Sequence, residues 1–433
     1  MQKSIDVCFE EIESLIAKIS SNSIKPGLGR IAKLLKELGN PERKFRAIHV
    51  LGTNGKGSTA CFIDSILRES GIKSALYSSP HIYHFGERLI INGNPLPSGK
   101  WIEKIQETAK ILENMEEKPS FFEVSTAIAF SLIAEAKVDF AVIEAGLGGR
   151  LDATNVMPNV LASVFTDIAM DHQEYLGNDI LSIATEKFSA LRPNGKSCYI
   201  GGNLSVENLY VANCKRLNNE GHITTREWKT SFRKMDLLET TFDIDTQEKT
   251  LENLKINLKG SHQVRNAANA LMAIHLLETQ KAVEISENTI RAGLLNARWP
   301  GRFEVIKMHG KTIILDGAHN PHGMASLVST VKSIFPNMKF SILFAAMKDK
   351  EYEESLKILN EIDGDLFLVS VPEMDRSETP QQLAKVANEI GWKGRCVPEE
   401  DLAVAFESAL NCNDVTLCCG SLYLIDRLYK LII

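Results

Sequence analysis

The stretch RAIHVLGTNGKGSTACFIDSILRES, residues 46 to 70, decides the fold. Its first six residues are mostly apolar and predict a buried strand. A helix is predicted after the glycine-rich turn, because Ile63, Ile66 and Leu67 follow the spacing of one helical face. A buried strand that leads through glycines into a helix is typical of an α/β protein with a parallel sheet.

The turn itself, GTNGKGS at 52 to 58, predicts a phosphate-binding loop. Glycines permit a tight turn, backbone N–H groups at a helix N-terminus face an anion, and Lys56 adds a positive charge. The Walker A pattern is not met strictly, because Gly57 separates Lys56 from Ser58. A purely structural glycine turn is the alternative, but it gives the lysine no packing role. The predicted ATP-binding residues here are Thr53, Asn54, Gly55, Lys56, Gly57 and Ser58.

Short apolar runs continue to alternate with helical stretches along the chain, which predicts a mostly parallel sheet. The next three runs are KSALYSS at 73 to 79, VDFAVIEAG at 138 to 146 and NVLASVFTD at 159 to 167. From about 197 to 260 the chain becomes polar and charged, and we expect a peripheral antiparallel excursion there.

Pro300 and Gly301 interrupt the helical pattern, and strand and helix alternation then restarts. The predicted fold class is therefore α/β with two domains. Residues 1–298 form the larger domain with the phosphate loop, and residues 299–433 form a smaller Rossmann-like α/β domain.

Composition excludes several classes of protein. The 433 residues carry 49 Lys and Arg against 55 Asp and Glu, a formal net charge of −6, so no nucleic-acid partner is expected. The first fifteen residues read as an acidic amphipathic helix, not a signal peptide, and no apolar run approaches the roughly 18 residues of a membrane span. We expect a cytoplasmic protein with no membrane association. Eight scattered cysteines predict reduced, mostly buried thiols and no zinc site.

The chain resembles the folylpolyglutamate synthase and dihydrofolate synthase family of the Mur ligase superfamily, nearly end to end. Besides the phosphate loop, the motifs that carry the resemblance are KPGLGRI at 25 to 31, YSSPH at 77 to 81, FFEVSTAIAF at 121 to 130, EAGLGGRLDATN at 144 to 155, TDIAMDHQEYLG at 166 to 177, GSHQVRNA at 260 to 267, WPGRFE at 299 to 304, LDGAHNPHG at 315 to 323 and CGSLYLI at 419 to 425. The larger domain is then expected to be a P-loop Mur-ligase-like domain.

The resemblance implies an ATP-dependent carbon–nitrogen ligase that adds L-glutamate to tetrahydrofolate, to dihydropteroate or to both, through an acyl phosphate. Mg²⁺ is the implied cofactor, ATP, L-glutamate and the folate or dihydropteroate are the implied partners, and a monomer is the family default. The smaller domain is expected to hold the glutamate site and to close over ATP, which would exclude water from the acyl phosphate.

The resemblance also implies roles for single residues. Those implied for catalysis are Lys56, His172, Lys187 and His319. The implied metal ligands are Ser58, Ser79, Glu144, His172 and Lys187, of which Lys187 matches a lysine that is carbamylated in many relatives. ATP would further contact Asn266, Arg302 and Asp316. The folate would contact Gly27, Leu28, Arg30, Phe121, Phe122 and Asp152, and the incoming glutamate would contact His319 and Ser421.

Several of these residues have structural alternatives. Ser79 precedes Pro80 and would suit a turn, Glu144 would suit a solvated strand end, and His172 alone would be a surface histidine. The alternative for Lys187 is an exposed lysine on a helix. Lys187 is followed by Phe188 and Ser189, where the family commonly has two small residues. Two phenylalanines at a helix start are often core residues, and Ser421 after Gly420 would begin a helix.

Two rival functions follow from the same residues. One is a Mur-superfamily amide ligase that acts on a different acid. Cell-wall members usually place a separate substrate domain before the phosphate loop, and only 51 residues precede Gly52 here. The other rival is a P-loop switch or motor, which would leave the second α/β unit with LDGAHNP unexplained. The sequence leaves open whether one or both folate activities are present, the polyglutamate length and the preferred folate form.

Overall fold

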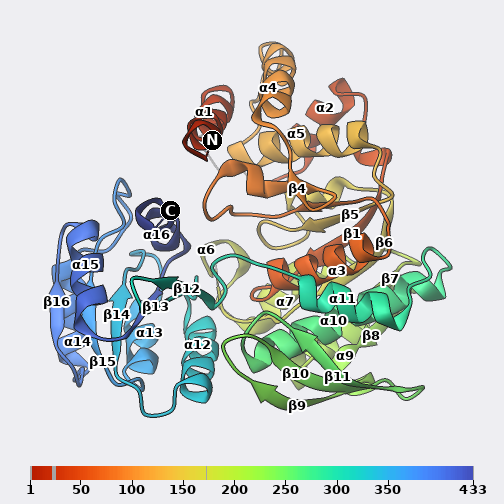
Figure 1. Cartoon of the computed structure of the whole chain (residues 1–433). Coiled ribbons are helices and arrows are strands. Elements are labelled where there is room, and N and C mark those ends of the chain that lie inside the picture. Colours follow the sequence, from red (N-terminus) through yellow and green to blue (C-terminus); the bar gives the residue numbers. More distant parts are fainter. Residues whose placement is uncertain (1, 22–25, 172, 433) are drawn as a thin grey trace. The chain divides into compact units, whose positions relative to one another are not determined.

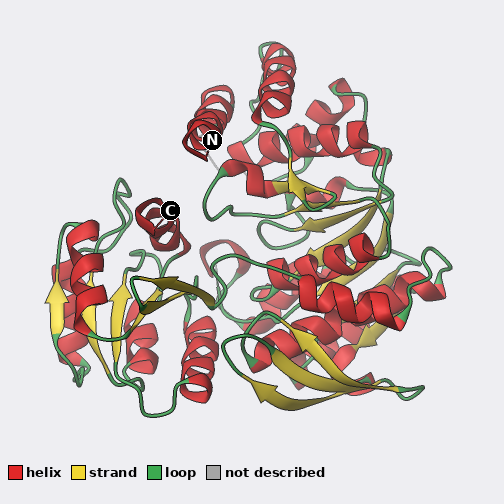
Figure 2. Cartoon of the chain, viewed as in Figure 1, coloured by secondary structure: helices red, strands yellow, loops and turns green. Residues whose placement is uncertain are grey.

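The computed structural model describes residues 2–21, 26–171 and 173–432. The chain divides into two compact units, each described here by itself. The first consists of Met1–Ser231, Phe242–Lys255 and Arg265–Ala297, and the second of Phe232–Thr241, Ile256–Val264 and Arg298–Ile433. Helices and strands alternate through most of the described chain (Figure 2), and the α/β fold class is confirmed.

The first unit contains an eight-stranded sheet in the order β4-β3-β2-β5-β1-β6-β7-β8. Its strands are β1 (Arg46–Leu51), β2 (Ser74–Tyr77), β3 (Leu89–Ile91), β4 (Asn94–Pro95), β5 (Phe140–Glu144), β6 (Val160–Phe165), β7 (Lys196–Tyr199) and β8 (Glu220–Ile223). Only the pairs β2–β3 and β3–β4 are antiparallel; the other pairs are parallel. The predicted mostly parallel sheet is confirmed.

Strand β1 lies at the centre of this sheet, between β5 and β6. Five of its six residues are buried, as expected for a strand covered on both faces. In the register, Val50 pairs with Glu144 and Leu51 pairs with Phe165. The loops that follow β1, β5 and β6 therefore leave the sheet at the same edge, where open parallel sheets bind their ligands.

Helices cover both faces of this sheet (Figure 1). The helices up to residue 297 are α1 (Gln2–Ile19), α2 (Gly29–Glu37), α3 (Lys56–Glu69), α4 (Ser98–Leu112), α5 (Phe121–Ala136), α6 (Gln173–Leu176), α7 (Ile180–Phe188), α8 (Leu204–Leu217), α9 (Thr224–Glu227), α10 (Ser261–Thr279) and α11 (Glu287–Asn296), with 3₁₀ turns η1 (Pro41–Arg43), η2 (Phe85–Arg88) and η3 (Ala153–Val156). One core joins α1, α2, α4 and α5 to the sheet, and a second joins α7 and α8 to β6 and β7.

The predicted antiparallel excursion over residues 197 to 260 is wrong for the first part of this range. Strand β7, helix α8 and strand β8 continue the large parallel sheet up to Ile223. Strand β8 is the last strand of the sheet and buries only Ile223, so its sequence is as polar as a loop. The excursion is confined to a three-stranded sheet of β9 (Lys229–Met235), β10 (Thr240–Asp245) and β11 (Thr250–Ile256), in the order β11-β10-β9.

The second unit holds a six-stranded sheet in the order β12-β13-β17-β14-β15-β16, parallel except for the β12–β13 pair. Its strands are β12 (Glu304–Met308), β13 (Lys311–Leu315), β14 (Phe340–Phe344), β15 (Gly364–Leu368), β16 (Cys396–Pro398) and β17 (Val415–Cys419). Its helices are α12 (Pro321–Ile334), α13 (Tyr352–Leu359), α14 (Pro380–Glu389), α15 (Leu402–Cys412) and α16 (Leu422–Ile432). One apolar core joins α12, α13 and α14 to the sheet.

The structure bears on two predictions made for the whole chain, one about membrane-spanning segments and one about the cysteines. None of the helices among the described residues is long and apolar enough to cross a membrane. The described cysteine side chains carry free thiols, and most of them are buried: Cys61, Cys198, Cys214, Cys418 and Cys419, with Cys396 and Cys412 half-buried. The Cys8 side chain lies outside the described part of the chain.

Candidate functional site

The predicted phosphate loop joins β1 to α3 and depends on two glycines. Gly52 has φ +146°, and a Cβ there would collide with the hydroxyl of Thr166 at the end of β6. Gly55 has φ +85° and is the N-cap residue of α3. Both conformations favour glycine, because L-residues with a side chain rarely adopt positive φ. The loop therefore brings its backbone to the N-terminus of α3, as an anion site requires.

Neighbouring segments hold this loop in place. The Thr53 N–H donates to the Asp167 carbonyl over 2.7 Å, and the Asn54 N–H donates to the same carbonyl over 3.3 Å. The Lys56 ammonium donates to the Thr53 carbonyl over 3.0 Å. Asn266, on α10, lies against the loop, since a Cβ on Gly55 would come within 2.5 Å of the Asn266 Oδ1. Asn266 and the loop, 211 residues apart, thus meet within the first unit.

Lys187, near the end of α7, lies directly under the loop. Its Nζ donates to the Gly52 carbonyl over 2.7 Å, and the residue is only 4% exposed. Burial lowers the pKa of Lys187 to about 7, and the positive charge of Lys56 acts in the same direction. The alternative of an exposed helix lysine is wrong, because the side chain points inward to the phosphate loop.

Two of the predicted metal ligands, Ser79 and Glu144, lie close together. Glu144 ends β5 and is 6% exposed, and the Ser79 N–H lies 3.4 Å from its Oε2. Ser58, in the first turn of α3, is buried. His172 lies outside the described residues. No group of three or more His, Cys, Asp or Glu forms a metal site among the residues that are described. The donors that remain are a carboxylate and two hydroxyls, which are the oxygen ligands that Mg²⁺ prefers.

The predicted folate residues fall into two groups. Arg30, on α2, forms an ion pair with Glu123 on α5 over 3.2 Å, and Gly27 and Leu28 precede it at the start of α2. Glu123 also accepts the Ser120 N–H over 2.8 Å in a capping box, which fixes the first turn of α5. The first group therefore joins α2 to the beginning of α5.

Phe122 and Asp152 belong to the second group, around the loop that follows β5. A Cβ on Gly146 would collide with the Phe122 ring, so this ring lies on the loop. Asp152 is 4% exposed, and burial raises its pKa although several hydrogen bonds oppose the rise. The neighbouring Phe121 contacts the Phe85 ring edge-on at 6.2 Å, and both Phe121 and Phe122 are partly buried against the same core.

The predicted residues of the second unit lie at the ends of β13 and β17. Asp316 accepts the Phe303 and Ala318 N–H groups over 2.8 Å each, and burial raises its pKa while the Arg302 charge opposes the rise. The His319 Nδ1 lies 2.9 Å from the Gly317 carbonyl. Ser421 is 2% exposed and caps α16, because its Oγ accepts the Tyr423 N–H over 3.2 Å.

The loops that carry His319 and Ser421 are joined by one hydrogen bond. The Gly420 N–H donates to the Ala318 carbonyl over 2.9 Å. A Cβ on Gly317 would collide with the Arg302 guanidinium, so Arg302 lies over the same turn. All four predicted residues of this unit therefore gather at one edge of its sheet, where the strands β13 and β17 end.

Comparisons with known proteins agree with this geometry. The Mur ligase middle domain matches residues 50–274, and the Mur ligase glutamate ligase domain matches residues 301–422. The dihydrofolate synthase/folylpolyglutamate synthase of Bacillus subtilis is 36% identical over 414 residues, which cover 94% of this chain and 95% of the relative. The chain belongs to the dihydrofolate synthase/folylpolyglutamate synthase family of Mur ligases. Members of this family are ATP-dependent ligases.

Two solved structures of the family have the same fold as this chain. The crystal structure of folylpolyglutamate synthase from Thermotoga maritima is 33% identical, with a TM-score of 0.85 over 98% of this chain and 96% of that one. An Escherichia coli structure in complex with DHPP and ADP is 28% identical, with a TM-score of 0.86 over 98% and 97% of the two chains. The resemblance inferred from the motifs is confirmed.

Sequence reasoning about this Mur ligase missed four polar residues around the site. Glu123 has a readable signal, because Ser120 and Glu123 have the spacing of a capping box. His49 is a polar residue inside the apolar strand β1, which is also visible in the sequence. Thr154 and Asp167 lie within two of the family motifs, but they act through a hydroxyl and a backbone carbonyl, and the motifs alone did not assign them these roles.

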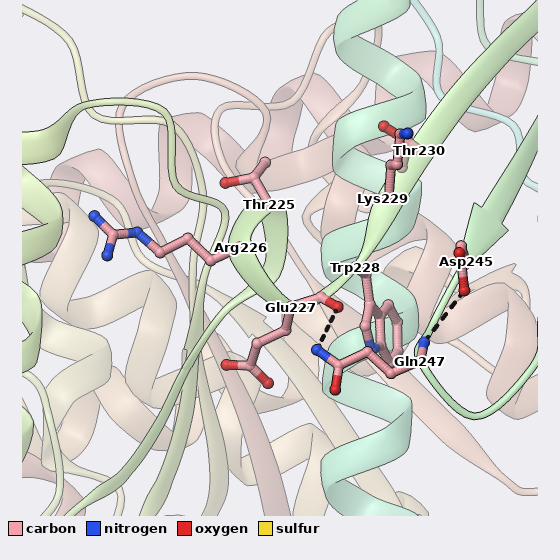
Figure 3. Close-up of a pocket in the computed structure, with 8 residues that line it drawn as sticks. All are labelled: Thr225, Arg226, Glu227, Trp228, Lys229, Thr230, Asp245 and Gln247. Atoms are coloured by element: carbon pink, nitrogen blue, oxygen red, sulfur yellow. Dashed lines mark hydrogen bonds between the residues drawn. The ribbon is translucent and has the colours of Figure 1, made fainter.

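A hollow of about 490 Å³ on the first unit of this Mur ligase does not contain the predicted site. It is lined by Thr225, Arg226, Glu227, Trp228, Lys229, Thr230, Asp245 and Gln247 (Figure 3), none of which was predicted to bind a substrate. The Gln247 amide donates to the Glu227 carbonyl over 3.2 Å across it. Nothing in the lining repeats the glycine-rich backbone or the buried carboxylate of the ligase site.

Proposed function

We propose that this chain uses ATP to join L-glutamate to dihydropteroate, to tetrahydrofolate or to both. One observation carries the proposal: two loops meet at Lys187. The Lys187 Nζ donates to Gly52 in the phosphate loop, and the Lys187 carbonyl lies against Gly149 in the loop after β5. The first loop suits the phosphates of ATP and the second belongs to the predicted folate residues. Such an arrangement suits transfer of a phosphoryl group to an acid.

The proposed reaction has two steps, formation of an acyl phosphate and formation of an amide bond. The carboxylate of the acid attacks the terminal phosphorus of ATP, which forms an acyl phosphate and releases ADP. The amine of glutamate then attacks the acyl carbon, the amide bond forms, phosphate leaves with the electron pair of the broken carbon–oxygen bond, and the proton lost by the nitrogen passes to the departing phosphate or to solvent. Lys56 and the backbone N–H groups of residues 55–58 would hold the phosphates, because negative charge shifts among phosphoryl oxygens in the first step.

Magnesium would be held by the Ser58 hydroxyl and the Glu144 carboxylate, with Ser79 and His172 as further proposed ligands. When bound, Mg²⁺ neutralises charge on phosphate oxygens. Lys187 is the proposed carbamylation site. A pKa of about 7 leaves much of this amine uncharged at neutral pH, and only an uncharged amine reacts with CO₂. A carbamate carbon signal with ¹³C-bicarbonate, absent in Lys187→Met, would test this assignment; the same signal in the variant would refute it.

We assign residues 1–298 to the ATP, metal and folate sites, and residues 299–433 to a glutamate-binding domain that closes over ATP. Arg302 and Asp316 are proposed for ATP, and His319 and Ser421 for glutamate. Arg302 supplies a charge that is always positive, which suits a phosphate. The gathering of these residues at the ends of β13 and β17 supports adjacent sites for the two substrates. Glutamate protection of backbone amides in residues 316–320 and 420–423 would support the assignment, and protection elsewhere would contradict it.

The function is tested by ADP formation with purified protein, ATP and Mg²⁺. Dihydropteroate and tetrahydrofolate are supplied separately, each with and without L-glutamate. The proposal requires amide product and ADP in equal amounts with at least one acid. ADP release that needs neither the acid nor glutamate would refute it.

A further inference from the structure

His49 is a fully buried polar side chain at the centre of β1. Its Nε2 lies 2.8 Å from the Thr154 Oγ1, and its Nδ1 has no hydrogen-bond partner among the described residues. An unsatisfied buried nitrogen costs free energy, and an apolar side chain at this strand position would avoid that cost. The hydrogen bond between Nε2 and Thr154 is therefore the contact that would explain why a histidine stands at this position.

The direction of that bond follows from the next one. The Thr154 hydroxyl donates its single hydrogen to the Asp152 Oδ1, so it must accept from His49. The ring therefore carries its proton on Nε2. Burial and the nearby Arg192 charge lower the pKa of His49 to about 3, which keeps the ring neutral. The three residues form a one-way chain of hydrogen bonds from His49 through Thr154 to Asp152.

Asp152 in turn fixes the loop that follows β5. Its Oδ2 accepts the Leu147 N–H over 2.7 Å, and its Oδ1 accepts the Thr154 N–H over 2.9 Å. The loop of residues 146–152 lies against the Phe122 ring at Gly146 and against the Lys187 carbonyl at Gly149. One carboxylate thus sets the position of a backbone segment that contacts both a proposed folate residue and the helix turn of the proposed catalytic lysine.

We propose that His49 is a positioning residue for the acid substrate. It orients Thr154 and Asp152, and through them it holds residues 146–152 in the conformation that receives the folate or dihydropteroate. The inference rests on the proposed function, because that function makes this loop a wall of the acid site. His49 itself stays inside the sheet and acts through the chain of hydrogen bonds.

Two variants of His49 separate this role from simple packing. His49→Gln places an amide N–H where Nε2 lies, whereas His49→Asn places its amide near Nδ1, which has no partner. Both replacements are neutral and polar. Hydrogen exchange of the Leu147 and Thr154 amides should be about tenfold faster in His49→Asn, because Asp152 loses its orientation. His49→Gln should exchange like the native protein.

Kinetics supply a second readout. His49→Asn should raise the KM for the acid about tenfold while the KM for ATP stays within twofold, and His49→Gln should restore the native KM. Thr154→Val should give the same rise, and the double variant His49→Asn/Thr154→Val should be no worse than either single variant, because both break one chain. An additive double variant would overturn the inference.

The inference would also be overturned if His49→Asn had the same amide exchange rates and the same KM for the acid as the native protein. The exchange measurement needs no substrate, so it decides the role of His49 even if the native protein forms no ADP with either acid. In that case the proposed function fails by itself. Faster exchange together with a changed KM for ATP alone would show that the chain of hydrogen bonds serves the phosphate loop, which contradicts the inference.

Discussion

Replacing Gly55 by Ala should damage ATP binding as well as the fold. Gly55 has φ +85°, where an L-residue with a Cβ costs about 1–2 kcal/mol. The new Cβ would also come within 2.5 Å of the Asn266 Oδ1. Ordinary contacts begin near 3.5 Å, so Asn266 or the loop must move by roughly 1 Å. A shift of this size misaligns the backbone N–H groups that are proposed to hold the phosphates.

Gly71 is the matched control for this variant, because it follows the same helix with φ +79° and open space where a Cβ would be added. Gly71→Ala should lower the free energy of unfolding in urea by about 1–2 kcal/mol and leave ADP binding unchanged. Gly55→Ala should lower stability by at least as much and weaken the Kd for ADP at least tenfold, about 1.4 kcal/mol, in titration calorimetry. Native ADP affinity in Gly55→Ala, or equal losses of affinity in both variants, would refute the reasoning.

Three further variants test single contacts. Lys56→Ala should abolish turnover while the free energy of unfolding in urea stays within about 1 kcal/mol, because it removes a charge from a loop; normal turnover would show that the loop has another role. From pH 7 to pH 9.5 in CO₂-free buffer, the free energy of unfolding of the native protein should rise relative to that of Lys187→Met, because the pKa of Lys187 is about 7 in the folded state and the unfolded chain therefore binds more protons at this position; parallel urea-unfolding profiles would contradict the lowered pKa. Asp316→Asn should lower the free energy of unfolding by about 1–3 kcal/mol, because an amide oxygen replaces two acceptors for the Phe303 and Ala318 N–H groups; an unchanged urea midpoint would contradict this role.

Much of the fold was predictable because its signals are local. The strand, glycine loop and helix from 46 to 70 follow from apolar spacing and from residues that suit positive φ. The edge strand β8 was missed, because a strand that buries one residue has almost no apolar pattern. Local patterns thus revealed the phosphate loop, but they did not reveal how many strands the sheet contains.

The contacts of the site were less predictable, because they join residues far apart in the chain. Lys187 and Gly52 are separated by 135 positions, and only the parallel sheet brings them together. The burial of Lys187, which lowers its pKa, has no signature in the TEKF sequence around it. His49 was visible as a polar residue in an apolar strand, but its partner Thr154 is 105 residues away.

The most direct test of the central claim is the stoichiometry of ADP to glutamate incorporated into product, measured with dihydropteroate and with tetrahydrofolate in turn. A glutamate ligase of this family should give one ADP for each glutamate joined with at least one acid, and no ADP when either glutamate or the acid is left out. ADP formation at the same rate without them, or no ADP with either acid, would contradict the account.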